Sequence, residues 1–142
     1  MRILGLDVGS KTVGVAVSDP LGVIATGVDT IERVGIRKDT GRVIDYIKEY
    51  DCDTVVIGLP VNLKGEDTLS TERAREFKSM LENKLKSSGP LSKVKVVWQD
   101  ERFSTTEAEQ VLIDANMSRE DRKKIIDKQA AVVILQRYLD KT

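Results

Sequence analysis

The sequence has no histidine, one cysteine and no long hydrophobic run. Without histidine the chain has no Ser-His-Asp triad, no histidine general base and no histidine-ligated zinc. With Cys52 alone it forms no internal disulfide and no cysteine zinc cluster. We interpret Cys52 as a small buried residue just before a strand rather than as a nucleophile. Catalysis by this chain would therefore use carboxylates, Lys, Arg, hydroxyls or a bound hard cation.

An excess of positive charge is also absent, because 23 Lys and Arg residues are balanced by 23 Asp and Glu residues. Nucleic-acid binders usually carry a basic excess, so only a local basic patch would support such a partner here. No apolar segment approaches the roughly 20 residues of a membrane span. The chain starts directly in a strand pattern without a signal-peptide pattern. We therefore expect a cytoplasmic protein with no membrane partner.

The pattern of apolar residues predicts one domain over residues 1–142. Strands are expected at residues 2–8, 13–18, 23–30, 54–58 and 94–98, and helices at residues 36–50, 69–86, from Ser104 through Ala115, and 124–139. Tight turns between the first three strands indicate an antiparallel meander. The strand-helix alternation that follows indicates an α/β fold, a mixed sheet with helices on both faces.

Asp7 is the first of three acidic residues at positions where burial favours an apolar side chain. It lies near the carboxyl end of an expected central strand, where open α/β sheets place their sites. The period of two puts Asp7 on the face of Ile3 and Gly5, and Gly5 leaves room beside the backbone for a ligand. The structural alternative is a carboxylate that caps the turn at Gly9.

The second candidate is the pair Asp100 and Glu101, which follows the last expected strand. Adjacent strand residues face opposite ways, so at most one of the two points with Asp7. We expect Glu101 to do so, with Asp100 as its substitute. The alternative is that both acids only interact with the dipole of the following helix.

Asp127 is the third candidate, because it lies on the apolar stripe of the last helix. Two of the residues that share its face, Ala130 and Ala131, are small enough to let the helix approach the sheet closely. An acid in the first turn of a helix also has a purely structural explanation in the helix dipole.

Three carboxylates from separate parts of a chain without histidine suit a hard divalent cation, Mg²⁺ or Mn²⁺, held together with water and phosphate oxygens. A pair of such ions ~4 Å apart activates a water and stabilises the leaving oxygen in phosphodiester cleavage. Asp7, Glu101 and Asp127 are therefore the expected catalytic and metal-binding residues.

Four segments of the chain together resemble the YqgF family of bacterial proteins, which are assigned as pre-16S ribosomal RNA nucleases and were earlier described as Holliday-junction resolvase-like. They are Gly5-Leu6-Asp7-Val8-Gly9-Ser10-Lys11 with residues 13–19, Gly58-Leu59-Pro60 with Asn62 and Gly65, Asp100-Glu101-Arg102 with residues 104–106, and Asp127 with residues 130–131 and 134–136. The resemblance spans essentially the whole chain. It implies a ribonuclease H-like fold, divalent-metal-dependent cleavage at Asp7, Glu101 and Asp127, and a role in maturing the 5′ end of the small-subunit ribosomal RNA.

Residues that would contact structured RNA are expected in the turns and in one basic run. The family usually has a basic residue after the lysine of its first motif, whereas this chain has Thr12, so any phosphate contact there falls to Lys11. The other substrate-binding candidates are Asn62, Arg102, Arg122, Lys123 and Lys124. Each also has a structural alternative: a turn residue for Lys11 and Asn62, an ion pair with Glu101 for Arg102, and a solvated helix face for the basic run.

Three other functions use the same features. A resolvase of four-way DNA junctions would use the same carboxylates on branched DNA and would need a two-fold dimer, so both a monomer and a homodimer stay open. A nucleotide-binding module of the actin and sugar-kinase type opens with a similar strand and turn, but 142 residues leave no room for its second lobe. A non-catalytic RNA-binding factor of ribosome assembly would not need Asp7.

Overall fold

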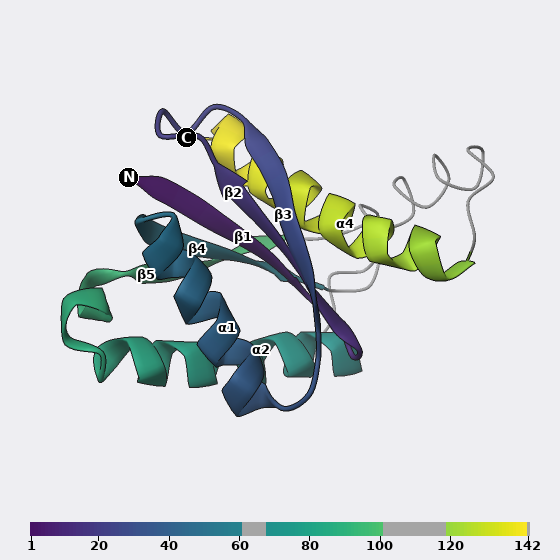
Figure 1. Cartoon of the computed structure of the whole chain (residues 1–142), viewed down its shortest axis with the longest axis horizontal. Helices are drawn as coiled ribbons and strands as arrows, with labels where there is room; N and C mark the ends of the chain where they lie inside the picture. The colour runs from purple at the N-terminus through teal and green to yellow at the C-terminus, as the bar shows by residue number, and fades with distance from the viewer. Residues whose placement is uncertain (61–67, 101–118, 142) are drawn as a thin grey trace.

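The computed structural model describes residues 1–60, 68–100 and 119–141, and for residues 119–127 it describes the backbone alone. Its elements follow in the order β1 (Arg2–Val8), β2 (Thr12–Ser18), β3 (Ala25–Glu32), α1 (Ile36–Glu49), β4 (Cys52–Leu59), α2 (Leu69–Lys86), the short 3₁₀ helix η1 (Gly89–Lys93), β5 (Lys95–Asp100) and α4 (Arg119–Lys141). The helix expected from Ser104 onward lies outside the described residues. Figure 1 shows the strands packed between α4 on one side and α1 and α2 on the other.

The five strands form one mixed sheet in the order β3-β2-β1-β4-β5. β1 pairs antiparallel with β2, and β2 pairs antiparallel with β3, which confirms the expected meander. β4 pairs parallel with β1 on one side and with β5 on the other. β1 is therefore the central strand, and its carboxyl end lies at the same edge of the sheet as the carboxyl ends of β4 and β5.

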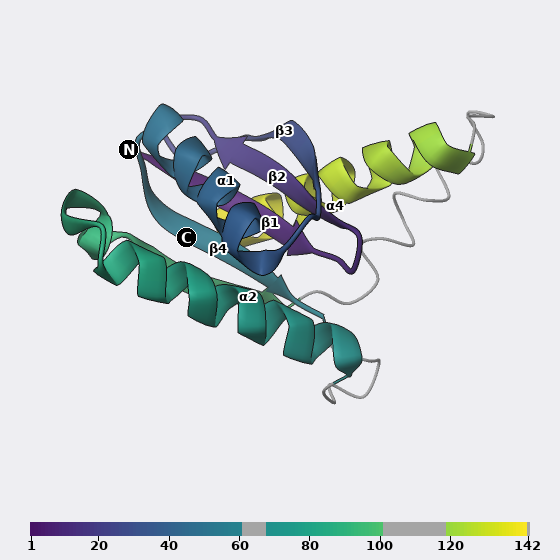
Figure 2. The same ribbon diagram turned by 60° about the horizontal axis from the view of Figure 1, so that its bottom comes forward.

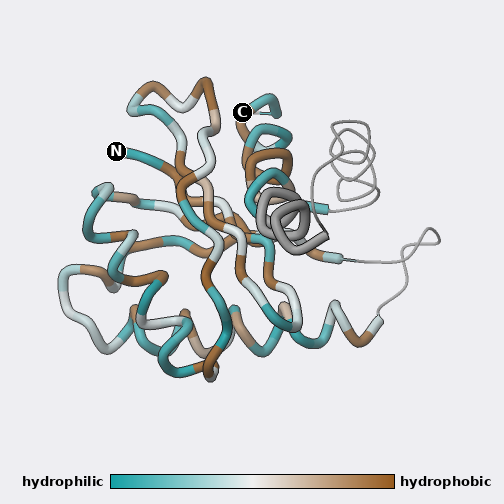
Figure 3. The backbone as a smooth tube through the Cα atoms, turned by 45° about the vertical axis from the view of Figure 1, so that its right-hand side comes forward, coloured by the Kyte–Doolittle hydropathy of each residue, from teal (hydrophilic) through white to brown (hydrophobic). Residues whose placement is uncertain are grey.

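Two hydrophobic cores lie on the two faces of the sheet, as expected for helices on both sides (Figure 2). One core joins Leu4 and Leu6 of β1 to buried residues of α1 and α2, including Phe77. The other joins alternate strand residues such as Val56 to the apolar face of α4. Figure 3 shows hydrophobic segments within the sheet and alternating hydrophobic and hydrophilic residues along α4.

Gly5 has a different purpose from the one expected. It does not leave room for a ligand, because a Cβ there would lie 2.7 Å from the Cβ of Leu135 and 3.2 Å from the carbonyl oxygen of Ala131. Both residues belong to α4 and are fully buried. The missing side chain thus lets α4 pack closely against β1, which confirms the expected close approach through Ala131 and corrects the function of Gly5.

Several element boundaries differ from the expectation, among them the starts of β3 and α4. β3 starts at Ala25 rather than at Val23, because the Asp19 carboxylate accepts hydrogen bonds from the backbone N–H groups of Val23 (2.7 Å) and Ile24 (2.9 Å) and keeps both residues in the turn. α4 starts at Arg119, five residues earlier than expected. None of the described helices is long and apolar enough to cross a membrane.

Candidate active site

Asp7 lies near the carboxyl end of β1, on the face of the sheet that α4 covers. Gly5 contacts α4 directly, and Asp7 is two residues further along the same strand, so both point to that face. The intervening residue Leu6 belongs to the core of α1 and α2. Asp7 is half-buried. The sequence prediction of its face is therefore confirmed.

The strand residues on either side of Asp7 are glycines. Gly14 of β2 is its direct partner in the antiparallel ladder. On the other side Leu6 is in register with Ile57, which makes Gly58 the neighbouring residue of β4 on the same face. The residues directly beside Asp7 in β2 and β4 therefore have no side chain.

Gln99 is a residue that the sequence analysis missed. It is in register with Gly58, and it lies two residues after Val97, which packs in the α4 core, so it shares the face of Asp7. The residue is only 6% exposed, and its side-chain Oε1 has no hydrogen-bond partner among the described residues. Its Nε2 donates to the carbonyl oxygen of Asp100 over 3.3 Å. The sequence did offer one signal, because Gln99 is a polar residue at a strand position where the alternation predicts an inward-facing side chain.

Asp100 is the last residue of β5 and is exposed. The residues that alternate with it, Val96 and Trp98, pack against the core of α1 and α2. The period of two therefore puts Asp100 on the face opposite Asp7. Its neighbour Glu101 lies outside the described residues.

Asp127 lies in α4, one helical turn before Ala131, the residue whose carbonyl oxygen faces Gly5. Its side chain is outside the described part of the structure. Among the residues whose side chains are described, no group of three His, Cys, Asp or Glu side chains gathers at one place. The structure thus describes the surroundings of Asp7, and only the chain position of Asp127.

Lys11 is exposed in the turn between β1 and β2. The turn is closed by the Gly9 N–H, which donates to the carbonyl oxygen of Thr12 over 2.9 Å. Thr12 itself begins β2 and pairs with Glu32 of β3, so it belongs to the sheet. Of the remaining substrate candidates, Asn62 and Arg102 lie outside the described residues.

The basic run Arg122, Lys123 and Lys124 belongs to the N-terminal turns of α4. Figures 1 and 2 show this end of the helix extending past the sheet on the side where β1 ends. The run is thus carried on the same side of the molecule as Asp7 and Lys11, although the sequence separates them by more than a hundred residues.

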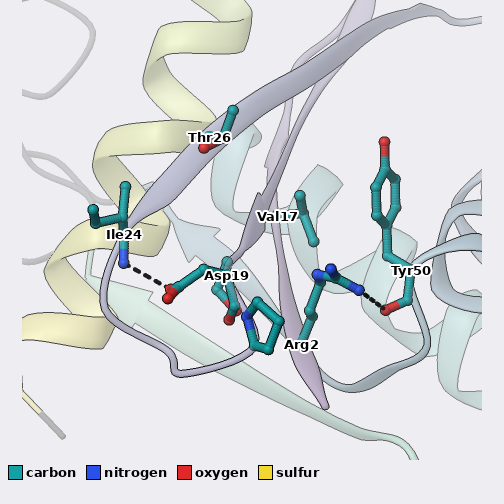
Figure 4. Close-up of a pocket in the computed structure, with 8 residues that line it drawn as sticks. Arg2, Val17, Asp19, Ile24, Thr26 and Tyr50 are labelled. Atoms are coloured by element: carbon teal, nitrogen blue, oxygen red, sulfur yellow. Dashed lines mark hydrogen bonds between the residues drawn. The ribbon is translucent and has the colours of Figure 1, made fainter.

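An open pocket of about 380 Å³ lies at the opposite end of β1, around Arg2 and Asp19 (Figure 4). Its two charged side chains, Arg2 and Asp19, have structural partners. Arg2 Nη1 donates to the carbonyl oxygen of Tyr50 over 3.4 Å. The backbone N–H groups of Ile24 and Val23 donate to Asp19 and lower the pKa of its carboxyl group. The pocket is thus remote from Asp7 and contains no unused acid.

Cys52 is buried as the first residue of β4. Burial raises the pKa of its thiol to about 12, so the thiolate is essentially absent at neutral pH. Both observations agree with the interpretation of Cys52 as a structural residue.

The fold is shared with nucleases that resolve DNA junctions. The structure titled "T. thermophilus RuvC in complex with Holliday junction substrate" aligns over 99% of this chain and 95% of its own, with a TM-score of 0.57 and 15% identity. The complex of the Fowlpox virus resolvase with junction DNA aligns over 99% and 98%, with a TM-score of 0.60 and 13% identity. Together with the mixed five-stranded sheet, these similarities establish the expected ribonuclease H-like fold.

The sequence comparisons are more specific. The RuvX family, described as "Holliday junction resolvase", matches residues 1–141. Two relatives are named "Putative pre-16S rRNA nuclease". The protein from Listeria innocua is 48% identical over 144 residues, which cover 100% of this chain and 99% of the relative. The protein from Clostridium beijerinckii is 46% identical over 140 residues, which cover 99% of this chain and 96% of the relative. The chain belongs to the RuvX family, the one introduced above as YqgF. Its class is therefore that of a nuclease, a hydrolase.

Proposed function

We propose that the chain cleaves phosphodiester bonds of precursor RNA with the help of a divalent metal, in maturing the 5′ end of pre-16S ribosomal RNA in the cytoplasm. The observation that carries the chemistry is the position of Asp7 on the α4 face of the central strand, between Gly14 and Gly58. The names of the relatives in Listeria and Clostridium support the substrate and hence a part in ribosome biogenesis.

Asp7, Glu101 and Asp127 form the proposed catalytic set. Asp100 and Asp7 lie on opposite faces of the sheet. The alternation of strand residues therefore favours Glu101, rather than Asp100, as the acid that acts together with Asp7. Asp127 precedes Ala131 by one turn, and Ala131 contacts β1 at Gly5, two residues before Asp7. The close contact between α4 and β1 supports Asp127 as the third acid.

The residues around Asp7 fit a hard cation. Hard cations such as Mg²⁺ and Mn²⁺ take oxygen ligands, and a carboxylate and an amide oxygen on the same face of a sheet are donors of that kind. Gln99 supplies such an oxygen, buried, without a partner among the described residues and on the face of Asp7. When bound, two such ions would supply an activated water and stabilise the leaving oxygen. The acids would hold and orient the ions, and the helix-covered face would limit the access of bulk water.

Basic side chains on the same side of the molecule are proposed to hold the RNA backbone. Lys11 is exposed beside the end of β1, and Arg122, Lys123 and Lys124 lie in the projecting end of α4. A local group of positive charges attracts the phosphate backbone even though the net charge of the whole chain is zero. Asn62 and Arg102 follow the ends of β4 and β5, which makes them further candidates for contact with the substrate.

A second candidate function is the resolution of four-way DNA junctions. The structural neighbours favour it, because two of them are described in complex with junction DNA. Symmetric cleavage of a four-way junction requires a two-fold dimer, whereas processing of a ribosomal RNA end does not. The oligomeric state in solution, monomer or homodimer, therefore separates the two functions.

The test is a cleavage assay with labelled pre-16S precursor RNA and a labelled four-way DNA junction, each with Mg²⁺ or Mn²⁺. We expect cleavage of the RNA that is lost in Asp7→Asn, Glu101→Gln and Asp127→Asn. Asp53→Asn is the matched control, because Asp53 is exposed and lies at the other end of the sheet in β4.

Mn²⁺ binding by electron paramagnetic resonance adds a measurement that does not depend on the substrate. The three site variants are expected to weaken Mn²⁺ binding, and Asp53→Asn is not. No cleavage of either substrate, together with equal Mn²⁺ binding by all variants, would refute the proposal. If Asp7→Asn restores ribosomal RNA maturation in cells as well as the unchanged chain does, the protein acts as a non-catalytic assembly factor.

A further inference from the structure

Arg33, in the segment between β3 and α1, contacts the turn that follows Asp7. Its side-chain Nη1 donates to the carbonyl oxygen of Gly9 over 3.1 Å. Its backbone N–H donates to the carbonyl oxygen of Lys11 over 2.9 Å. One residue thus holds two of the three carbonyl groups of the turn, the third belonging to Ser10.

Arg33 is itself fixed from the face of the sheet opposite Asp7. Its Nε donates to Asp39 Oδ2 over 3.0 Å, and the Asp39 side chain is completely buried. The same carboxylate accepts from the backbone N–H groups of Val34 at 3.1 Å and Gly35 at 3.4 Å. The guanidinium carbon lies 5.6 Å from the centre of the Phe77 ring of α2. The position of Arg33 is therefore set by α1 and α2.

A purely structural contact at this place would not need an ion pair. A buried ion pair is expensive to desolvate, and apolar residues of similar size often replace it without loss of stability. An apolar pair, however, offers no donor to Gly9. The planar guanidinium uses two different nitrogens to reach Asp39 and Gly9 at once, whereas a lysine at this position has one nitrogen for both acceptors.

We propose that Arg33 is a positioning residue of the nuclease site, which fixes the turn between Asp7 and Lys11 and so orients both side chains toward the nucleic acid. This inference rests on the proposed function of Asp7 and Lys11. It makes the geometry of the site depend on α1 and α2, although Asp7 faces α4.

The test compares Arg33→Lys with Arg42→Lys. Arg42 lies in α1 and pairs with Asp29 at 3.3 Å, but none of the described hydrogen bonds connects it to the turn. Backbone relaxation and amide exchange of Gly9, Ser10 and Lys11 are measured by NMR without metal or nucleic acid. We expect Arg33→Lys to loosen the turn while the protein stays folded, and Arg42→Lys to leave the turn unchanged.

The functional arm is a double-mutant cycle between Arg33→Lys and Lys11→Ala in the cleavage assay. We expect Arg33→Lys alone to lower kcat/KM by about 10- to 100-fold, the range for residues that orient a site without touching the substrate. In the Lys11→Ala background we expect a clearly smaller loss, because part of the effect passes through Lys11.

A turn with unchanged relaxation in Arg33→Lys would overturn the inference, and so would a loosened turn with unchanged cleavage. Equal losses in both backgrounds would overturn the coupling to Lys11. If the unchanged protein cleaves neither RNA nor junction DNA, the proposed function fails instead. The double-mutant cycle is then measured on RNA affinity instead of cleavage. The relaxation of the turn and the loss caused by Arg33→Lys with and without Lys11 again decide the positioning function of Arg33.

Discussion

Gly5 of β1 and Leu135 of α4 are in such close contact that a Cβ at Gly5 would come within 2.7 Å of the Leu135 Cβ. Gly5→Ala therefore has to push α4 away from the sheet. We expect a loss of about 1–3 kcal/mol of unfolding free energy, the usual cost of overpacking a core, measured by urea denaturation. Because α4 also carries Asp127, cleavage should fall as well.

The matched control is Gly41→Ala in the interior of α1. A Cβ at Gly41 would have only Lys84 Nζ nearby, at 3.8 Å. Because alanine is the better helix former, this change should stabilise the protein by about 0.5–1 kcal/mol. If Gly5→Ala were as stable as the original protein, the close packing of α4 on β1 would be contradicted.

Lys11→Ala tests whether the turn beside Asp7 meets the phosphate backbone. Loss of one phosphate contact should weaken binding to all sequences and reduce the slope of log K against log salt by about 1. Lys95→Ala is the control, because Lys95 is also exposed but lies at the amino end of β5. If the slope of log K against log salt is the same for the two variants, Lys11 is a solvated turn residue that does not contact phosphate.

The sheet and the faces of its strands were predictable because they depend on local alternation. The wholly apolar run of β4 was sufficient to predict a strand buried on both faces, and the single charge after the apolar residues of β1 was sufficient to single out Asp7. The start of β3 was not predictable in this way. Val23 and Ile24 favour a strand by type, but their N–H groups donate to Asp19, and the carbonyl oxygen of Val23 accepts from Gln136, more than a hundred residues away. These hydrogen bonds keep both residues in the turn.

The candidate site was predictable where a charge interrupts an apolar pattern, and less so where its environment depends on distant residues. Gly5 was misinterpreted because its space is filled by α4, which only the tertiary structure shows. Gln99 carries no charge, so it did not stand out within β5. Arg33 looked like an ordinary polar residue of a loop, because its bonds to Gly9 and Asp39 join segments that the sequence does not relate.

Cys52 should resist alkylation in the folded protein. Burial raises the pKa of its thiol from the ordinary value of 9.0 to about 12, and only the thiolate reacts. Iodoacetamide at pH 8 is therefore expected to modify the protein in urea but not without it, as measured by mass spectrometry. Rapid modification of the folded protein would contradict the burial of Cys52.

The same shift predicts a dependence of stability on pH. Between pH 9 and 12 the unfolded chain releases the Cys52 proton while the folded chain retains it, so unfolding becomes easier as the pH rises. Below pH 9 both states hold the proton and the effect is absent. Cys52→Ala should lose unfolding free energy less steeply than the original protein in this range, measured by urea denaturation at several pH values.

Gln99→Met separates stability from function. The Oε1 of Gln99 is buried without a partner among the described residues, and such an acceptor costs about 1–3 kcal/mol. Methionine has a similar volume and no such oxygen, so unfolding in urea should require about 1 kcal/mol more. If this oxygen serves the proposed metal site, Mn²⁺ binding should become weaker at the same time.

Gln136→Met is the control, and we expect it to change the stability in the opposite direction. Both the oxygen and the nitrogen of the Gln136 amide already make hydrogen bonds. Its Oε1 accepts from the Ala25 N–H and its Nε2 donates to the carbonyl oxygen of Val23, each over 2.9 Å. Losing these bonds should destabilise the protein by about 1 kcal/mol and leave Mn²⁺ binding unchanged. If Gln99→Met destabilises the protein as Gln136→Met does, the Gln99 amide is an ordinary structural group, and its oxygen on the face of Asp7 no longer supports a metal site.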